Sequence, residues 1–156
     1  MDNRSKLIDL FDYLIEALPL SDRAIQIQPN DFETLINKGN SLASLNRHDE
    51  AIECFQESIK LNPDFSTSYS NLGSSLIQLK RYQDALKCFE MAISINSEFA
   101  PSYNNLSIAQ THLGKLEEAV KSANKGKYKW NGIKLKLKLL IIDRSNRAST
   151  FIYRCL

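Results

Sequence analysis

Few residues in this sequence can cross-link the chain, bind a metal or enter a membrane. Three cysteines are too few for a disulfide framework. The two histidines, His48 and His112, have no cysteine or second histidine at the spacing of metal ligands. The longest purely apolar run, residues 139–142, is far shorter than the ~20 residues of a membrane span. A secretory signal peptide is excluded by the acidic residues Asp2, Asp9, Asp12 and Glu16. We therefore expect a cytoplasmic protein.

The motifs that mark common catalytic sites are also absent. The sequence contains no GxSxG, no phosphate-binding loop of the Walker type, no HExxH and no CxxC. Cys54 follows His48 by six residues, which places the two on different faces of a helix and disfavours a nucleophile–base pair. We predict that the chain is not an enzyme and uses neither a metal nor a cofactor.

Charge is distributed unevenly along the chain. The net charge is only +2, but residues 1–120 hold 10 Lys/Arg against 17 Asp/Glu, whereas residues 121–156 hold 10 Lys/Arg against Asp143 alone. Such asymmetry suggests that the basic end binds an acidic partner. A solvent-exposed end cap, an acidic protein surface, and nucleic acid or membrane all stay open as explanations, although isolated lysines are weak support for nucleic acid. The basic patch consists of Lys125, Lys127, Lys129, Lys134, Lys136 and Lys138.

Three consecutive blocks of 34 residues occupy the middle of the chain: residues 32–65, 66–99 and 100–133. Self-similarity at a fixed period of this length is typical of a helical solenoid. The aligned positions are Leu35/Tyr69/Tyr103, Asn37/Asn71/Asn105, Gly39/Gly73/Ser107, Ala51/Ala85/Ala119 and Ser58/Ala92/Gly126.

These blocks resemble the tetratricopeptide repeat family over about two thirds of the chain. The residues that fit the family pattern are Leu35, Gly39, Leu42, Ala51, Phe55 and Pro63 in the first block, and Tyr69, Leu72, Gly73, Leu76, Ala85, Phe89 and Ala92 in the second. The third block keeps Tyr103, Leu106 and Ala119, but has Gln110, Ala123 and Asn131 in place of two aromatic residues and a proline. The resemblance implies an all-α fold, an α-solenoid (superhelix) of antiparallel helix pairs.

Each block is expected to form two helices joined by a tight turn. The expected helices span residues 31–45 and 48–61, 66–79 and 82–95, and 100–113 and 116–127, with turns at Asn46-Arg47, Lys80-Arg81 and Gly114. Glycine is costly inside a helix. Gly39 and Gly73 are therefore expected where the two helices of a pair cross too closely for a side chain.

The two ends of the chain depart from the repeat pattern. Residues 1–31 resemble a degenerate N-terminal repeat or cap, in which Pro19 predicts a break near Leu18. Ser21 or Asp22 would then cap a restarted helix. Residues 134–156 are interpreted as a basic C-terminal cap or tail. Within them a capping helix over 134–144 is favoured, although residues 133–142 alternate like a strand.

Cys54 and Cys88 occupy the same position in neighbouring blocks. Packed helix axes lie roughly 8–10 Å apart, whereas a disulfide needs Cα atoms within about 7 Å. We expect free thiols and a reducing compartment.

In this family the first helices line a concave groove that binds extended peptides or partner helices. Transferred to this sequence, the peptide-binding groove would contain Glu33, Asn37, Asn40, Ser70, Asn71, Ser74, Asn104, Asn105 and His112. Only Glu33 among them carries a fixed charge. Co-chaperone members hold a C-terminal carboxylate with asparagines and cations. The asparagines match Asn40 and Asn71, but the cations are replaced by Ile36, Pro101 and Asn105, which disfavours that ligand.

The repeated asparagine at positions 37, 71 and 105 has two interpretations. An amide both donates and accepts hydrogen bonds, so these three asparagines could pair with the backbone of a bound peptide. Alternatively, the amides satisfy backbone groups between neighbouring repeats. The function expected is a non-catalytic protein–protein interaction module, an adaptor or scaffold that binds a protein or peptide partner. The alternatives are a structural subunit of a large multiprotein assembly, or binding of an acidic partner or nucleic acid through the lysine-rich segment.

Overall fold

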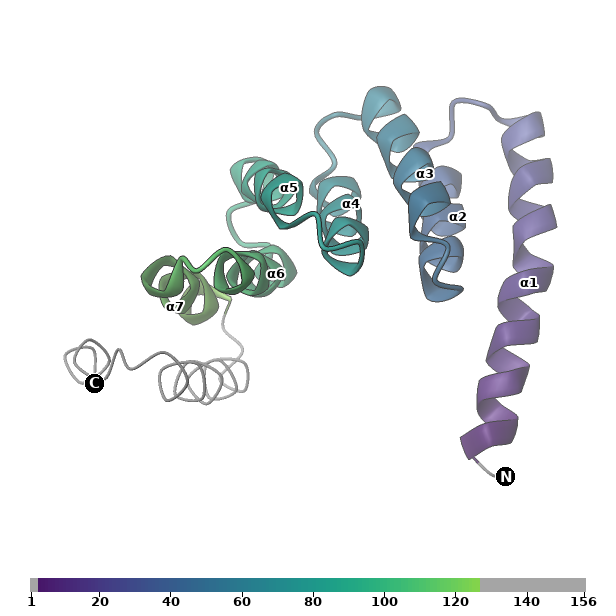
Figure 1. Cartoon of the computed structure of the whole chain (residues 1–156). Helices are drawn as coiled ribbons and strands as arrows, with labels where there is room; N and C mark the ends of the chain where they lie inside the picture. Colours follow the sequence, from purple (N-terminus) through teal and green to yellow (C-terminus); the bar gives the residue numbers. More distant parts are fainter. Residues whose placement is uncertain (1–2, 127–156) are drawn as a thin grey trace.

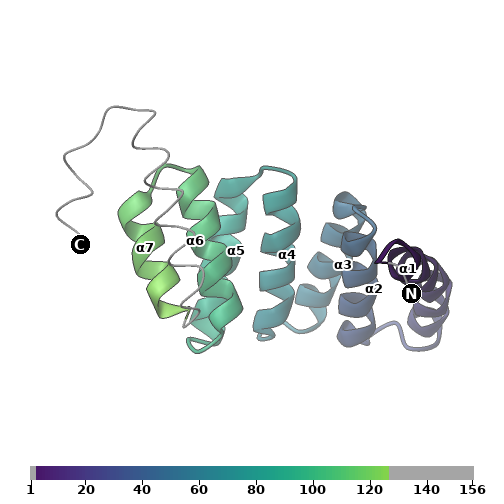
Figure 2. The ribbon, with the colours of Figure 1, turned by 90° about the horizontal axis from the view of Figure 1, so that it is seen from below.

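The computed structural model describes residues 3–126, which form seven α-helices and no strand. The helices are α1 (Asn3–Ile27), α2 (Phe32–Ser44), α3 (His48–Leu61), α4 (Ser66–Gln78), α5 (Tyr82–Ile95), α6 (Ala100–His112) and α7 (Leu116–Lys125). Three antiparallel pairs, α2/α3, α4/α5 and α6/α7, stack side by side into a curved solenoid, and α1 packs on α2 at one end (Figures 1 and 2). The first helices of the pairs, α2, α4 and α6, follow the inner side of the curve (Figure 1). The expected all-α solenoid is therefore confirmed.

The same turn closes the first helix of every pair. Asn46, Lys80 and Gly114 have positive φ values of 60°, 60° and 76° at equivalent positions. The next residue donates its backbone N–H to a carbonyl five residues earlier: Arg47 to Leu42, Arg81 to Leu76 and Lys115 to Gln110, at 2.8–2.9 Å. This pattern satisfies helix carbonyls that would otherwise lack a donor. The turns predicted at these three places are confirmed.

Within each of the first two pairs, an aromatic ring packs against a glycine. A Cβ atom added at Gly39 would lie 2.5 Å from the Phe55 ring, and one at Gly73 would lie 2.7 Å from the Phe89 ring. The predicted close crossings are therefore confirmed. The third pair has Ser107 opposite Ala123 instead. Both of these residues are buried, so the ring is exchanged for a pair of small side chains.

The expected break at Pro19 is wrong, because α1 is one continuous helix with Pro19 inside it. Proline removes one bond to the carbonyl four residues earlier, that of Ile15. Both residues are exposed, so water can hydrate that carbonyl. Ser21 does not cap a new helix, and its hydroxyl donates to the carbonyl of Ala17 at 3.0 Å. Asp22 pairs with Lys38 on α2 at 2.5 Å and raises the pKa of that lysine.

The predicted helix boundaries hold to within about two residues. The second helices α3 and α5 begin and end where expected, and α2 begins one residue later because Asp31 caps it, accepting from the backbone N–H of Glu33 at 3.1 Å. One acidic residue in the first turn of each second helix pairs with the basic residue three positions earlier, as in Arg47–Glu50 at 2.6 Å. The predicted cap over residues 134–144 lies outside the described residues.

Candidate functional site

The inner face, the surface along α2, α4 and α6, is lined mainly by amides and hydroxyls. Of the predicted groove residues, Glu33, Asn37, Asn40 and His112 are exposed, and Asn71, Ser74 and Asn105 are half-buried. Ser70 and Asn104 are only 3% and 8% exposed. We therefore leave these two out of the proposed site. Residues of a first helix that packing buries cannot be distinguished from groove residues by their spacing alone.

Two of the three repeated asparagines connect neighbouring first helices. Asn71 Nδ2 donates to Asn40 Oδ1 at 2.9 Å, and Asn105 Nδ2 donates to Ser74 Oγ at 3.0 Å. Each bond joins positions 31 residues apart, so the same contact recurs at both repeat junctions. Among the described residues, the side chain of Asn37 has no such partner. The amides of Asn71 and Asn105 therefore bond side chains of the preceding repeat, not its backbone.

The Asn40–Asn71 pair keeps hydrogen-bonding capacity after its mutual bond is formed. An amide has two N–H donors and a carbonyl acceptor. Asn40 uses its oxygen and Asn71 uses one N–H, and the described residues supply no partner for the remaining amide groups. The bonded pair thus keeps a free donor on Asn40 and a free acceptor on Asn71. One residue of an extended peptide, whose N–H and C=O point to the same side, has the complementary pair of functions.

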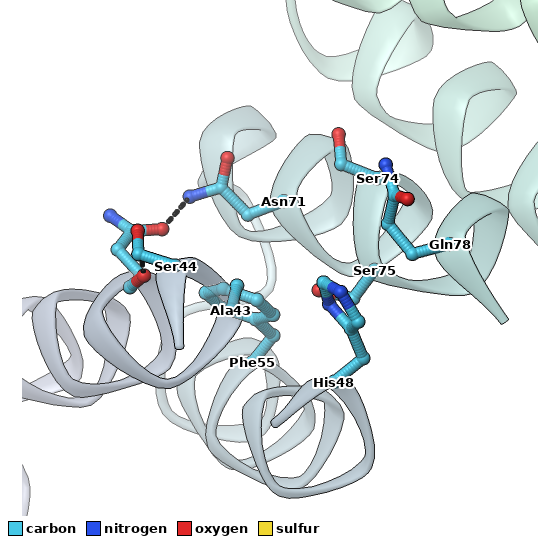
Figure 3. A pocket seen from close by; sticks show the side chains of 9 residues that line it. Ala43, Ser44, His48, Phe55, Asn71, Ser74, Ser75 and Gln78 are labelled. Atoms are coloured by element: carbon cyan, nitrogen blue, oxygen red, sulfur yellow. Dashed lines mark hydrogen bonds between the residues drawn. The ribbon is translucent and has the colours of Figure 1, made fainter. Parts of the chain in front are cut away.

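A pocket of about 380 Å³ opens beside this pair, between the first and second repeats (Figure 3). His48, the first residue of α3, lies close to Ser75 and Gln78 of α4 on one side of the pocket (Figure 3). Its Nδ1 atom is buried and has no hydrogen-bond partner. The lining residues are Asn40, Ala43, Ser44, His48, Phe55, Asn71, Ser74, Ser75 and Gln78.

Sequence reasoning did not assign His48 to the site. The signal that could have found it is the repeat alignment, which places His48 and Tyr82 at the starts of consecutive second helices. Tyr82 stacks on the predicted groove residue His112, with ring centroids 4.2 Å apart and planes 5° from parallel. The start of a second helix therefore faces the end of the next first helix, across the junction between repeats.

Only one lysine of the predicted basic patch lies in the described part of the chain. Lys125 Nζ lies 5.8 Å from the centroid of the Tyr103 ring, which is within cation–π range. The remaining patch residues, Lys127, Lys129, Lys134, Lys136 and Lys138, lie outside the described residues. The patch therefore stays a prediction.

Among residues 3–126, no group of three or more His, Cys, Asp or Glu side chains could hold a metal ion. None of the helices α1–α7 is long and apolar enough to cross a membrane. Cys54 and Cys88 are free thiols, as predicted. Burial raises the pKa of both, that of Cys88 to about 11.

The raised pKa of Cys88 predicts low reactivity. The thiolate is the nucleophile, and a pKa of about 11 lies roughly two pH units above the ordinary value, so the thiolate fraction at pH 7 falls about 100-fold. We expect iodoacetamide to modify Cys88 about 100-fold more slowly in the folded chain than in urea, with a rate that rises as the pH approaches 11. Peptide mass spectrometry separates Cys88 from the other cysteines. Equal rates in the folded and unfolded chain would contradict the burial argument.

Comparison with known proteins agrees with this geometry. The family model for the tetratricopeptide repeat matches residues 32–65 and 66–99. No curated protein matches the sequence. Among solved structures, MamA 41-end from Desulfovibrio magneticus RS-1 superimposes with a TM-score of 0.75 at 23% identity, covering 94% of this chain and 88% of that one.

Two further solved structures share the fold. The first TPR of Spaghetti (RPAP3), bound to the HSP90 peptide SRMEEVD, has a TM-score of 0.66 at 24% identity, covering 75% of this chain and 94% of that one. The Arabidopsis OM64 TPR domain has a TM-score of 0.66 at 22% identity, with coverages of 69% and 93%. At these identities the likeness shows the fold. The chain is thus similar to the tetratricopeptide repeat family in sequence over residues 32–65 and 66–99, and in fold over its three helix pairs.

Proposed function

We propose that this chain is a non-catalytic, cytoplasmic interaction module that binds an extended segment of a partner protein along its inner face. The observation that carries the proposal is the Asn40–Asn71 pair, which keeps a free donor on Asn40 and a free acceptor on Asn71 after its own 2.9 Å bond is made. An extended peptide presents N–H and C=O groups whatever its sequence. The pair therefore has the chemistry to hold a peptide backbone.

The charge of the inner face disfavours a C-terminal carboxylate as the ligand. Glu33 is the only predicted groove residue with a fixed charge. The positions at which co-chaperone relatives carry cations hold Ile36, Pro101 and Asn105 here. The HSP90 peptide of the RPAP3 structure, SRMEEVD, ends in an acidic residue. We propose that this chain instead binds an internal segment with little charge.

Alanine substitutions of the repeated asparagines Asn37, Asn71 and Asn105 separate a structural role from a binding role. Asn71→Ala and Asn105→Ala each remove one hydrogen bond between repeats and should lower the free energy of unfolding by about 0.5–1.5 kcal/mol. Asn37→Ala should change it by less than about 0.5 kcal/mol, since Asn37 is exposed. Denaturant titration of the full chain measures these values.

Affinity is the second measurement. The partner is captured from the native cell with the full chain as bait, and its bound segment is found by scanning overlapping peptides. We expect Asn40→Ala and Asn71→Ala to weaken binding of that segment about tenfold, the effect of losing roughly 1.4 kcal/mol of hydrogen bonding. Gln56→Ala, on the exposed surface of α3, is the control and should bind like wild type. Wild-type affinity in both asparagine variants would mean that these side chains stabilise the fold and do not bind the partner.

A second candidate function is that of a structural subunit in a larger assembly. The observation that favours it is α1 at the end of the stack, where Tyr13, Leu20 and Ile27 are 68%, 68% and 72% exposed. These residues recur every seven positions and form one stripe along the helix. Partner binding that persists in Asn40→Ala and Asn71→Ala but is lost in Leu20→Asp would favour this role. Salt-sensitive binding lost with residues 121–156 would instead favour the basic patch.

A further inference from the structure

The two repeat junctions of the described chain differ at one place on the inner face. At the second junction, Tyr82 and His112 stack at 4.2 Å. At the first junction, the equivalent residues are His48 and Gln78, and here the pocket of about 380 Å³ lies open. The same two repeat positions therefore hold a pair of stacked rings at the second junction and line a pocket at the first.

His48, in the wall of this hollow, carries an unsatisfied polar atom. Its Nδ1 is buried without a hydrogen-bond partner. The large majority of buried polar side-chain atoms in native proteins have a partner. An uncharged imidazole nitrogen either donates or accepts, depending on where the ring proton sits. With the ring turned so that Nδ1 enters the hollow, a ligand group that can do both, such as an amide or a hydroxyl, satisfies this atom in either form.

The walls of the pocket point to the same chemistry. They carry the amides of Asn40, Asn71 and Gln78, together with serine hydroxyls, and no Lys, Arg, Asp or Glu lines the pocket. A charged side chain would lose water there without gaining an opposite charge. A purely apolar side chain would cover the wall amides and leave them unpaired.

Building on the proposed function, we propose that this pocket is the specificity subsite of the inner face and that it receives an uncharged Asn, Gln, Ser or Thr side chain of the bound segment. The Asn40–Asn71 pair, which we assign to the peptide backbone, lies at the edge of the same pocket (Figure 3). A segment held there through the N–H and C=O of one residue places an adjacent side chain into the hollow. The backbone contacts accept any sequence, so the pocket supplies the selectivity.

The test uses a random peptide library displayed on phage and selected on the immobilised full chain. Peptides enriched by the wild type should share an Asn, Gln, Ser or Thr at one position. Changing that residue to alanine should lower affinity for the wild type about tenfold, because it leaves buried polar groups unpaired.

Two variants of the pocket separate its role from that of the groove. His48→Phe keeps the ring and removes both nitrogens. The double variant His48→Tyr/Gln78→His copies the stacked pair of the second junction into the first. Both should still bind peptides through the backbone but lose the preference at that position. Circular dichroism and denaturant titration check folding, and the double variant decides the matter if His48→Phe does not fold. Gln56→Ala should keep the wild-type preference.

The possible outcomes separate the two proposals. Enrichment of no peptide at all would overturn the peptide-binding function, and the subsite with it. Enriched peptides without a fixed polar position, or the same preference in wild type and both pocket variants, would overturn the subsite alone.

Discussion

Phe89→Ala should lower the free energy of unfolding by about 3–5 kcal/mol, the range for removing a buried phenylalanine. The ring is fully buried between α4 and α5, and it fills the space that Gly73 leaves open. Truncation therefore removes apolar burial and leaves a cavity in the middle of the stack. Denaturant titration followed by circular dichroism measures the change. Phe55→Ala should behave similarly at the Gly39 crossing.

Gly73→Ala is the matched substitution on the facing helix. Its new Cβ would lie 2.7 Å from the Phe89 ring, so we expect a loss of about 1–3 kcal/mol from overpacking. In the double variant the ring is gone and the new methyl group has space. The combined loss should therefore be smaller than the sum of the single losses, since contacting residues are not additive. Strict additivity would show that the glycine is not required by the ring.

Ser68→Ala should cost about 1–3 kcal/mol, although it removes only one oxygen atom. Ser58 Oγ and Ser68 Oγ form a 2.9 Å hydrogen bond at a fully buried place between α3 and α4. Truncating Ser68 leaves the hydroxyl of Ser58 buried without its partner. The loss should appear as a lower denaturation midpoint with an unchanged denaturant dependence.

Ser102→Ala is the control, because it makes the same chemical change at the equivalent position of the next repeat. There the partner position holds Ala92 in place of a serine, and the buried Ser102 Oγ has no hydrogen-bond partner. Removing an unsatisfied hydroxyl should leave stability unchanged or raise it. The two serines are indistinguishable by residue type and repeat position. If Ser102→Ala destabilises the chain as much as Ser68→Ala, the serine pair is not what stabilises the first junction.

The sequence by itself determined the helix pairs and their turns. The period of 34 residues, the glycine opposite each phenylalanine, and the turns at Asn46, Lys80 and Gly114 all depend on contacts within one repeat. Such contacts recur at constant spacing, so they can be predicted without coordinates. Pro19 was the exception. A local helix-breaking signal predicted a break, but α1 continues through it, because one lost hydrogen bond on an exposed surface does not outweigh the rest of the helix.

Only the tertiary structure decided which side chains of the first helices are available to a partner. Packing buries Ser70, and the junctions between repeats pair Asn71 with Asn40 and Asn105 with Ser74. They also leave a hollow beside His48 where the next junction stacks two rings. The physical reason is that the inner face is built across repeat junctions. The chemistry at a junction depends on two residues about 30 positions apart, and their side-chain volumes decide whether space remains between them.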